Sequence, residues 1–248
     1  MEEMLHLAKK DFDIALLLYN EKEYSNALYH YHQCVEKTVN YIGLSTGIIS
    51  EEQLIKEIRH NPIDVFMILF NHISEQYKEL IPHMDPNIFI TNAKQIIRTK
   101  SEELLVSQVI NSIKEICNEK ELIDVNKFPS KLDALSDFVS KFLPNLVNVY
   151  TFNSEPQKQY VSVILDEKIN NSINFINNGI KILWRLLMNS LICSKYTPDS
   201  FRNYSSKIGN PVEYFNESNP IIVGLPFLLE TMNIPILFAG KINWKQIV

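Results

Sequence analysis

The chain has 248 residues, of which only 6 are glycine, about one third of the share found in an average soluble protein. Phosphate-binding glycine loops and dinucleotide-binding fingerprints need glycine where the backbone approaches a ligand, and no G-x-G occurs in the sequence. A nucleotide-binding α/β fold is therefore disfavoured. With 24 basic and 29 acidic residues the formal net charge is -5, so only a local basic patch could attract nucleic acid.

The three cysteines, Cys34, Cys117 and Cys193, are widely spaced and form no C-x-x-C pair. Neither a disulfide framework nor a structural zinc site is expected, and no cofactor is predicted. The N-terminus is acidic and lacks the basic and apolar regions of a signal peptide. These features predict a cytoplasmic protein with reduced thiols.

The first part of the chain predicts two amphipathic helices joined by a tight turn. Apolar residues recur at helical spacing from Glu2 to about Asn20, and again from about Tyr24 to Ile42. Gly43 and Gly47 follow the second helix, where C-terminal caps favour glycine. Two helices with so short a connection should form an antiparallel hairpin.

More helices are expected beyond this hairpin. Ser50 and Gln53 have the spacing of a capping box for a short helix that ends before Pro62. Apolar spacing then predicts helices over residues 63–80, 87–123 with a break near Ser101, 130–142, and 156–191 as one long helix or two.

The pattern predicts an all-α protein, built as an up-and-down helical bundle with additional helices in its middle and an irregular C-terminal tail. We expect residues 1–196 to form the bundle and residues 197–248 to form an irregular segment packed on it. Two helical lobes divided near Pro129 are the alternative. Residues 221–240 are as long and apolar as a membrane span, but polar residues and two prolines interrupt them, so we expect buried packing and no contact with a membrane.

The second predicted helix holds the densest group of chemically capable side chains. His30 and His32 are about 200° apart around a helix, so the two rings cannot share a metal ion. His32 and Glu36 are i,i+4 neighbours. His30, Gln33 and Lys37 form a separate polar stripe. One histidine and one carboxylate make an incomplete metal site, so hydrogen bonds between helices are expected and metal binding is not.

Charged residues elsewhere have a structural and a functional interpretation. Asp11 borders the apolar face of the first helix, and Lys37 or His30 across the hairpin is its expected partner. Arg59 and His60 stand at the end of the third helix, where capping is expected and a phosphate or RNA contact is the alternative.

A small basic cluster follows further along the chain. Lys94, Arg98 and Lys100 could meet a phosphate backbone, although three cations among many acids are typical of a solvated face. The sequence contains no complete catalytic motif such as G-x-S-x-G, H-E-x-x-H or a Walker loop.

The opening hairpin resembles that of the HEPN superfamily (higher eukaryotes and prokaryotes nucleotide-binding). The matching residues are Ala8, Asp11 and Ala15, then Tyr24, Ala27, Tyr29, His30, Gln33, Glu36 and Lys37. Residues 60–62 and 191–198 resemble family segments more loosely. The resemblance implies an up-and-down helical bundle, a homodimer, and binding or cleavage of RNA. It also implies a toxin–antitoxin, stress or defence setting with a nucleotidyltransferase-type protein partner.

Ribonuclease members of that family use an arginine and a later histidine on a late helix, with four to six residues between the two. After Arg185 those positions hold Ser190, Leu191 and Ile192, and no histidine occurs after His83. The resemblance therefore predicts a non-catalytic protein that binds RNA, a nucleotide or a protein partner. A metal-independent endoribonuclease with a non-standard active site and a helical scaffold without a nucleic-acid role are the alternatives. The candidate binding residues are Arg59, His60, His30, Lys37 and Arg185, and the expected structural network is Asp11, Gln33 and Glu36.

Overall fold

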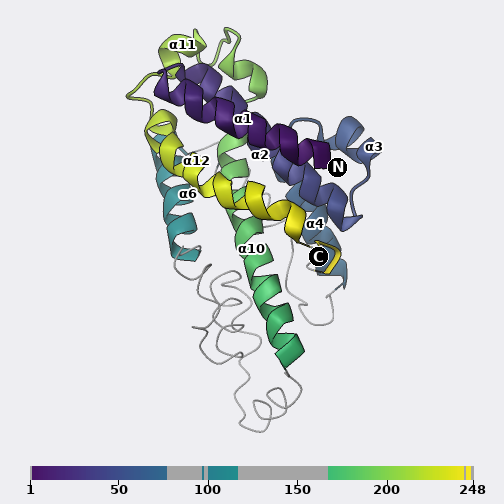
Figure 1. Cartoon of the computed structure of the whole chain (residues 1–248). Helices are drawn as coiled ribbons and strands as arrows, with labels where there is room; N and C mark the ends of the chain where they lie inside the picture. Colours follow the sequence, from purple (N-terminus) through teal and green to yellow (C-terminus); the bar gives the residue numbers. More distant parts are fainter. Residues whose placement is uncertain (1, 77–96, 98–99, 117–166, 243, 247–248) are drawn as a thin grey trace.

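The computed structural model describes residues 2–76, 97, 100–116, 167–242 and 244–246. These residues form helices and turns, and they contain no strand beyond an isolated antiparallel bridge between Ser205 and Gly209. Figure 1 shows long helices lying side by side and crossing one another, as in a helical bundle. The all-α prediction is confirmed.

The two N-terminal helices form the predicted hairpin. Helix α1 spans Glu2–Asn20 and helix α2 spans Tyr24–Thr46. α2 runs one turn further than expected, because Gly43 lies inside it and Gly47 ends it in the left-handed region at φ 76°. Gly43 provides a close contact instead, since a Cβ there would lie 3.0 Å from Cγ1 of Val65 on the next long helix.

The chain then makes an irregular helical passage that ends at the Arg59–His60 pair. The Ser50–Gln53 capping box is present and begins the short helix α3, Glu51–Gln53. A π-helical turn, η1, continues over Leu54–Ile58 and ends at Arg59, whose φ of 53° is left-handed. Helix α4, Pro62–Gln76, follows directly.

Two further helices complete the bundle in the described part of the chain. Helix α6, Glu102–Ile116, begins at the predicted break, where the backbone N–H of Leu104 donates to Ser101 Oγ at 3.3 Å. Helix α10 spans Glu167–Cys193 as one continuous helix. The expected helix over residues 130–142 and the alternative boundary near Pro129 lie outside the described residues.

The expectation of an irregular tail after residue 196 is wrong for much of that segment. The tail contains two ordered short helices and one long helix: η2 Pro198–Phe201, α11 Pro211–Tyr214 and α12 Pro220–Phe238, then short turns η3 Ala239–Lys241 and η4 Trp244–Gln246. The side chain of Asn219 caps α12 by accepting from the backbone N–H of Ile221 at 2.9 Å. Because α12 is apolar around most of its circumference and contains two prolines, it carries no clear helical periodicity in the sequence.

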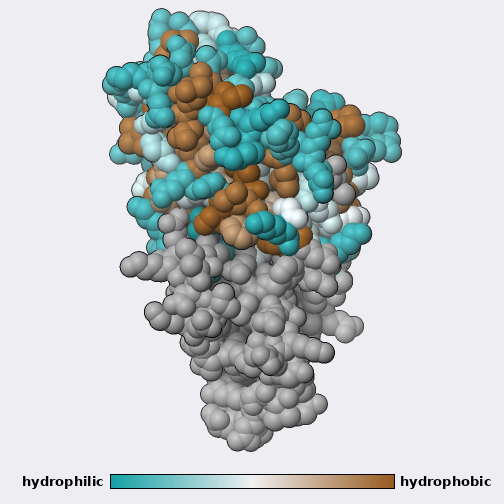
Figure 2. Space-filling model, viewed as in Figure 1, coloured by the Kyte–Doolittle hydropathy of each residue, from teal (hydrophilic) through white to brown (hydrophobic). Residues whose placement is uncertain are grey.

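Helix α12 packs on the bundle along much of its length. It contacts α1, α2, α6 and α10, and ten of its residues are buried. Residues 220–241 are, within the described residues, the one helical stretch long and apolar enough to cross a membrane, with a mean hydropathy of 1.9. More than half of its most apolar part is buried inside the protein. The remaining apolar side chains of α12 reach the surface, and Figure 2 shows apolar residues gathered on that face of the molecule.

A buried polar chain ties three of these helices together. The Tyr31 hydroxyl on α2 donates to Asn189 Oδ1 on α10 at 2.6 Å. The Asn189 amide in turn donates to Thr231 Oγ1 on α12 at 3.2 Å. Since Asn189 and Thr231 are 0% and 2% exposed, these bonds fix the register of α12 against the bundle.

Replacing Gly224 with alanine should destabilise the fold. A Cβ at Gly224 would lie 2.5 Å from Cγ1 of Val106 on α6, and the β-branched Val106 has little rotamer freedom with which to move away. We expect a loss of about 1–3 kcal/mol in the free energy of unfolding, measured by urea denaturation. The control is Glu230→Ala, which places an alanine at an exposed position of the same helix and should change stability little. Unchanged stability of Gly224→Ala would contradict this contact.

Candidate functional site

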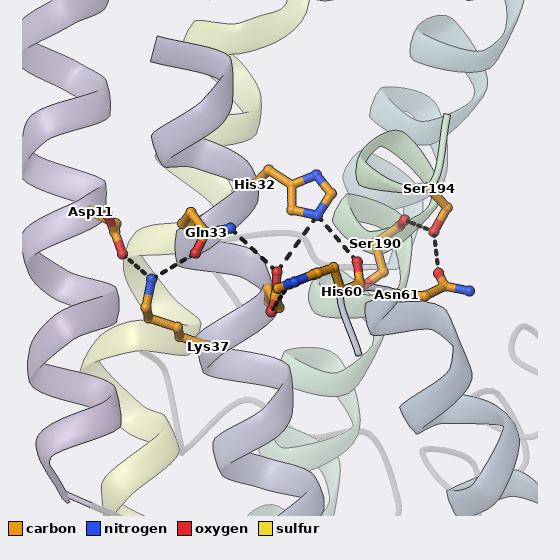
Figure 3. A network of polar contacts seen from close by, with 9 residues as sticks. Asp11, His32, Gln33, Lys37, His60, Asn61, Ser190 and Ser194 are labelled. Atoms are coloured by element: carbon orange, nitrogen blue, oxygen red, sulfur yellow. Dashed lines mark hydrogen bonds and ion pairs between the residues drawn. The ribbon is translucent and has the colours of Figure 1, made fainter. Parts of the chain in front are cut away.

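A cluster of polar side chains joins α1 to α2 within the hairpin. Asp11 accepts from both predicted partners: its Oδ1 lies 2.8 Å from His30 Nδ1 and its Oδ2 lies 2.6 Å from Lys37 Nζ. Lys37 also donates to Gln33 Oε1 at 3.0 Å, as Figure 3 shows. The predicted Asp11 partnership is therefore confirmed with both candidates, and it fixes the two helices of the hairpin together.

The next member of the network, Glu36, reaches from α2 to the turn before α4. Its Oε1 lies 3.0 Å from His60 Nδ1, and its Oε2 accepts from Gln33 Nε2 at 3.4 Å. Burial raises the pKa of Glu36, while the His60 side chain is 71% exposed. With Nδ1–H donating to the carboxylate, Nε2 is the ring nitrogen of His60 that remains to meet a ligand.

His32 supports the same turn from inside the protein. The side chain is 2% exposed, and Nε2 lies 3.4 Å from the backbone oxygen of His60 and 3.8 Å from Glu36 Oε2. Burial lowers the pKa of His32 to about 4, so the ring is neutral at pH 7 and its Nε2–H donates to the His60 carbonyl (Figure 3).

The two histidines of α2 thus face different elements, as their spacing predicted. His30 contacts Asp11 on α1, whereas His32 contacts the turn that contains His60. Among the residues that the structure describes, no group of three or more His, Cys, Asp or Glu side chains is placed to hold a metal ion.

The far side of this turn is joined to the end of α10. Ser194 Oγ lies 3.1 Å from Asn61 Oδ1 and 2.8 Å from the backbone oxygen of Ser190. Asn61 also donates from Nδ2 to Asp64 Oδ2 at 2.7 Å. The turn is therefore held from α2, from α4 and from α10 (Figure 3).

An open pocket of about 720 Å³ lies between these elements. One wall is formed by Tyr29 and Gln33 of α2 and by residues 58–61 and Ile63, and the opposite wall is formed by residues 193–199 at and after the end of α10. Arg59 and His60 are exposed on the first wall. Lys195 on the second wall donates to the backbone oxygens of Ile97 and Lys100, both at 2.9 Å. Burial lowers the pKa of Lys195.

Two further cations lie over tyrosines of the pocket. The guanidinium carbon of Arg202 is 3.4 Å from the ring centroid of Tyr29. Lys207 Nζ is 4.8 Å from the ring centroid of Tyr196. Arg202 and Lys207, together with Arg59, His60 and Lys195, therefore concentrate basic groups around the pocket. Among the described residues that line the pocket, one carries a carboxylate, namely Asp199. This is the kind of local basic patch that a chain of net charge -5 needs in order to bind an anion.

The structure places the predicted site residues in three different regions. Arg59 and His60 line the pocket, whereas His30 and Lys37 contact Asp11 in the hairpin and are not part of its lining. Arg185 is 1% exposed, so its guanidinium lies inside the bundle and not at the pocket. Of the small basic cluster, the side chains of Lys94 and Arg98 lie outside the description, and Lys100 donates to Gln108 Oε1 at 2.5 Å.

Sequence reasoning missed the contributions of Arg202 and Lys207. Arg202 contacts Tyr29 of α2, and Lys207 contacts Tyr196 just after α10. These contacts depend on how the turn-rich segment that carries the two cations folds back, and local periodicity in the sequence does not predict them. The available signal was compositional: residues 202–209 contain two cations, one tyrosine and no acid.

Comparisons with known proteins extend these observations. The family described as "HEPN domain" matches residues 1–123. A protein of Methanocaldococcus jannaschii named "Putative toxin" is 22% identical over 134 residues, which are 54% of this chain and 84% of that relative. No solved structure matches the chain. The matched family region includes the hairpin network and the Arg59–His60 pair, while the opposite wall of the pocket lies beyond it.

Proposed function

The chain belongs to the HEPN superfamily through its N-terminal half, and from this premise we propose that it binds RNA at the pocket between α2, the Arg59–His60 turn and the end of α10. Binding is through phosphate groups and does not require cleavage. The similarity to a protein named as a toxin supports a toxin-like or nucleotide-related role.

The observation that carries the proposal is the backbone of Arg59. Its φ of 53° is costly for a non-glycine residue. The cost is offset by the hydrogen bond from its N–H to Leu54 O at 2.8 Å and by the contacts of Glu36 and His32 with His60. The result is that Arg59 and His60, which are both exposed, stand next to each other at the pocket. A guanidinium and an imidazole so placed suit the recognition of a phosphate.

The interior of α10 supports binding over cleavage by the family mechanism. Ser190 occupies one of the positions where a catalytic histidine is expected after Arg185. It is 0% exposed, and its hydroxyl donates to Leu186 O at 2.7 Å. Such a side chain supplies neither an acid nor a base to a substrate.

A second function, metal-independent cleavage of RNA, is favoured by one observation. His60 is backed by the carboxylate of Glu36 at 3.0 Å, which is the arrangement that orients a histidine as a general base. Arg59 would then stand beside it to stabilise a charged phosphate.

Replacement of Arg59 by alanine tests the proposed site. We expect the affinity for a fluorescein-labelled single-stranded RNA, measured by fluorescence anisotropy, to fall about tenfold, because a charge-assisted phosphate contact is lost. The matched control is Lys56→Ala, which removes a cation from the preceding turn, where Lys56 pairs with Glu52 at 2.6 Å away from the pocket lining. Equal affinities of the two variants would contradict the proposal.

An RNA cleavage assay with the wild-type protein distinguishes binding from cleavage. Incubation of unlabelled RNA with the wild type in the presence of a chelator should leave the RNA intact. Cleavage that His60→Ala abolishes would instead establish the second function, whereas cleavage that persists in His60→Ala would point to a contaminating nuclease.

The family membership also carries two proposals on partners. One is a homodimer, which light scattering coupled to size-exclusion chromatography tests. The other is a nucleotidyltransferase-type protein, which co-purification from the native host tests.

A further inference from the structure

We infer that residues 202–207 extend the pocket into a binding track, so that the ligand is a single-stranded oligonucleotide longer than one nucleotide. The inference rests on the proposed RNA-binding function and adds a second contact region to it. We call this region, made of Arg202, Tyr204 and Lys207, the rim.

The rim is continuous with the pocket. Arg202 stacks on Tyr29 at 3.4 Å, and Lys207 lies 4.8 Å from the ring centroid of Tyr196 and 3.4 Å from the backbone oxygen of Lys195. Tyr29, Lys195 and Tyr196 all line the pocket. A strand whose phosphate is bound at Arg59 therefore meets further cations as soon as it leaves the pocket on this side.

The segment that carries the rim has a defined conformation. Ser205 and Gly209 exchange backbone hydrogen bonds of 3.2 and 2.8 Å, and Gly209 adopts φ 70°. Phe201 and Ile208, at the two ends of the segment, are 4% and 8% exposed. The buried ends hold the segment against the bundle, so the polar side chains between them point outward in a fixed arrangement.

The chemistry of the rim favours nucleic acid over other anions. Tyr204 is 79% exposed and lies between Arg202 and Lys207 in the sequence. An exposed tyrosine in a short basic segment offers a ring on which a base can stack while the cations meet the backbone. Residues 202–209 contain no acidic side chain to repel phosphate. Because the bases of a duplex are already stacked, such a surface selects single strands.

The test is a length series of labelled oligouridylates, from about 4 to about 12 nucleotides. Wild-type affinity should increase about tenfold over this series. In Arg202→Ala/Lys207→Ala the affinity for the longest oligonucleotide should fall more than the affinity for the shortest one, so that the increase with length disappears. For the longest oligonucleotide the slope of log affinity against log salt should fall by about 1.4. Tyr204→Leu should reduce the affinity for the longest oligonucleotide about tenfold.

Lys241→Ala is the matched control for these substitutions. Lys241 also lies over an aromatic ring, that of Phe238 at 5.1 Å, and is exposed, but it is not part of the pocket lining. It should bind every oligonucleotide as the wild type does. Thermal unfolding of each variant verifies the fold, and Tyr204→Leu changes an exposed side chain only.

The possible failures are distinguishable. Equal wild-type affinity for short and long oligonucleotides, with a normal Arg59→Ala effect, would overturn the rim and leave the pocket function standing. Equal weakening of all lengths by the double variant, or equal affinity for duplex and single strand, would also overturn the rim. Absence of binding at every length would overturn both proposals.

Discussion

Replacing Leu228 with alanine should lower the free energy of unfolding by about 2–5 kcal/mol. Leu228 lies on α12 and is 0% exposed, in a helix that contacts α1, α2, α6 and α10. Removing its methyl groups leaves a cavity that the surrounding helices can close only in part. Urea denaturation followed by circular dichroism measures the effect, and we expect one cooperative transition because α12 shares a core with the hairpin.

The control for Leu228 is a leucine on the same helix. Leu237 is 49% exposed, so Leu237→Ala makes the same change in helix propensity with little loss of packing, and should cost less than about 1 kcal/mol. A similar effect of the two substitutions would show that α12 does not contribute its buried face to the stability of the bundle.

Periodicity explains why most helices were predictable and α12 was not. In α1 the buried residues Ala8, Phe12 and Ala15 recur at helical spacing. The sequence reveals that spacing directly, although Leu16 and Leu17 of the same helix are exposed. In α12 apolar residues occupy buried and exposed positions alike, and Pro226 and Pro235 break the expected pattern. Such a helix is held by tertiary packing, which local spacing does not report.

The candidate site also combines contacts that the sequence predicts with contacts that depend on tertiary packing. The Asp11–Lys37 contact was predictable because a short turn fixes how α1 and α2 face each other. The Arg202–Tyr29 stack depends on how the tail returns to α2. Arg185 was a candidate through its place in the family pattern, yet the described part of α10 is buried around it, with Ile182, Leu186 and Asn189 also shielded from water.

Acidification should destabilise the protein through His32. The folded-state pKa of about 4 lies below the ordinary value of 6.5, so between these values the unfolded chain binds a proton that folded His32 does not. Stability from this residue is complete above about pH 6.5 and is lost as the pH falls towards 4, by about 3 kcal/mol. Glu36 acts in the opposite sense, because burial raises its pKa and its stability contribution falls as the pH rises above 4.5.

A variant separates His32 from the other titrating groups. In His32→Leu the difference in unfolding free energy between about pH 7 and about pH 4.5 should be smaller than in the wild type, because the titrating ring is gone. NMR titration of the wild-type His32 ring should give a midpoint near pH 4; a midpoint near 6.5 would contradict the prediction. The Nε2–H of His32 donates to the His60 carbonyl in both protonation states. The cost of acidification is therefore desolvation of a buried charge, and the turn that presents Arg59 should keep its conformation until the protein unfolds.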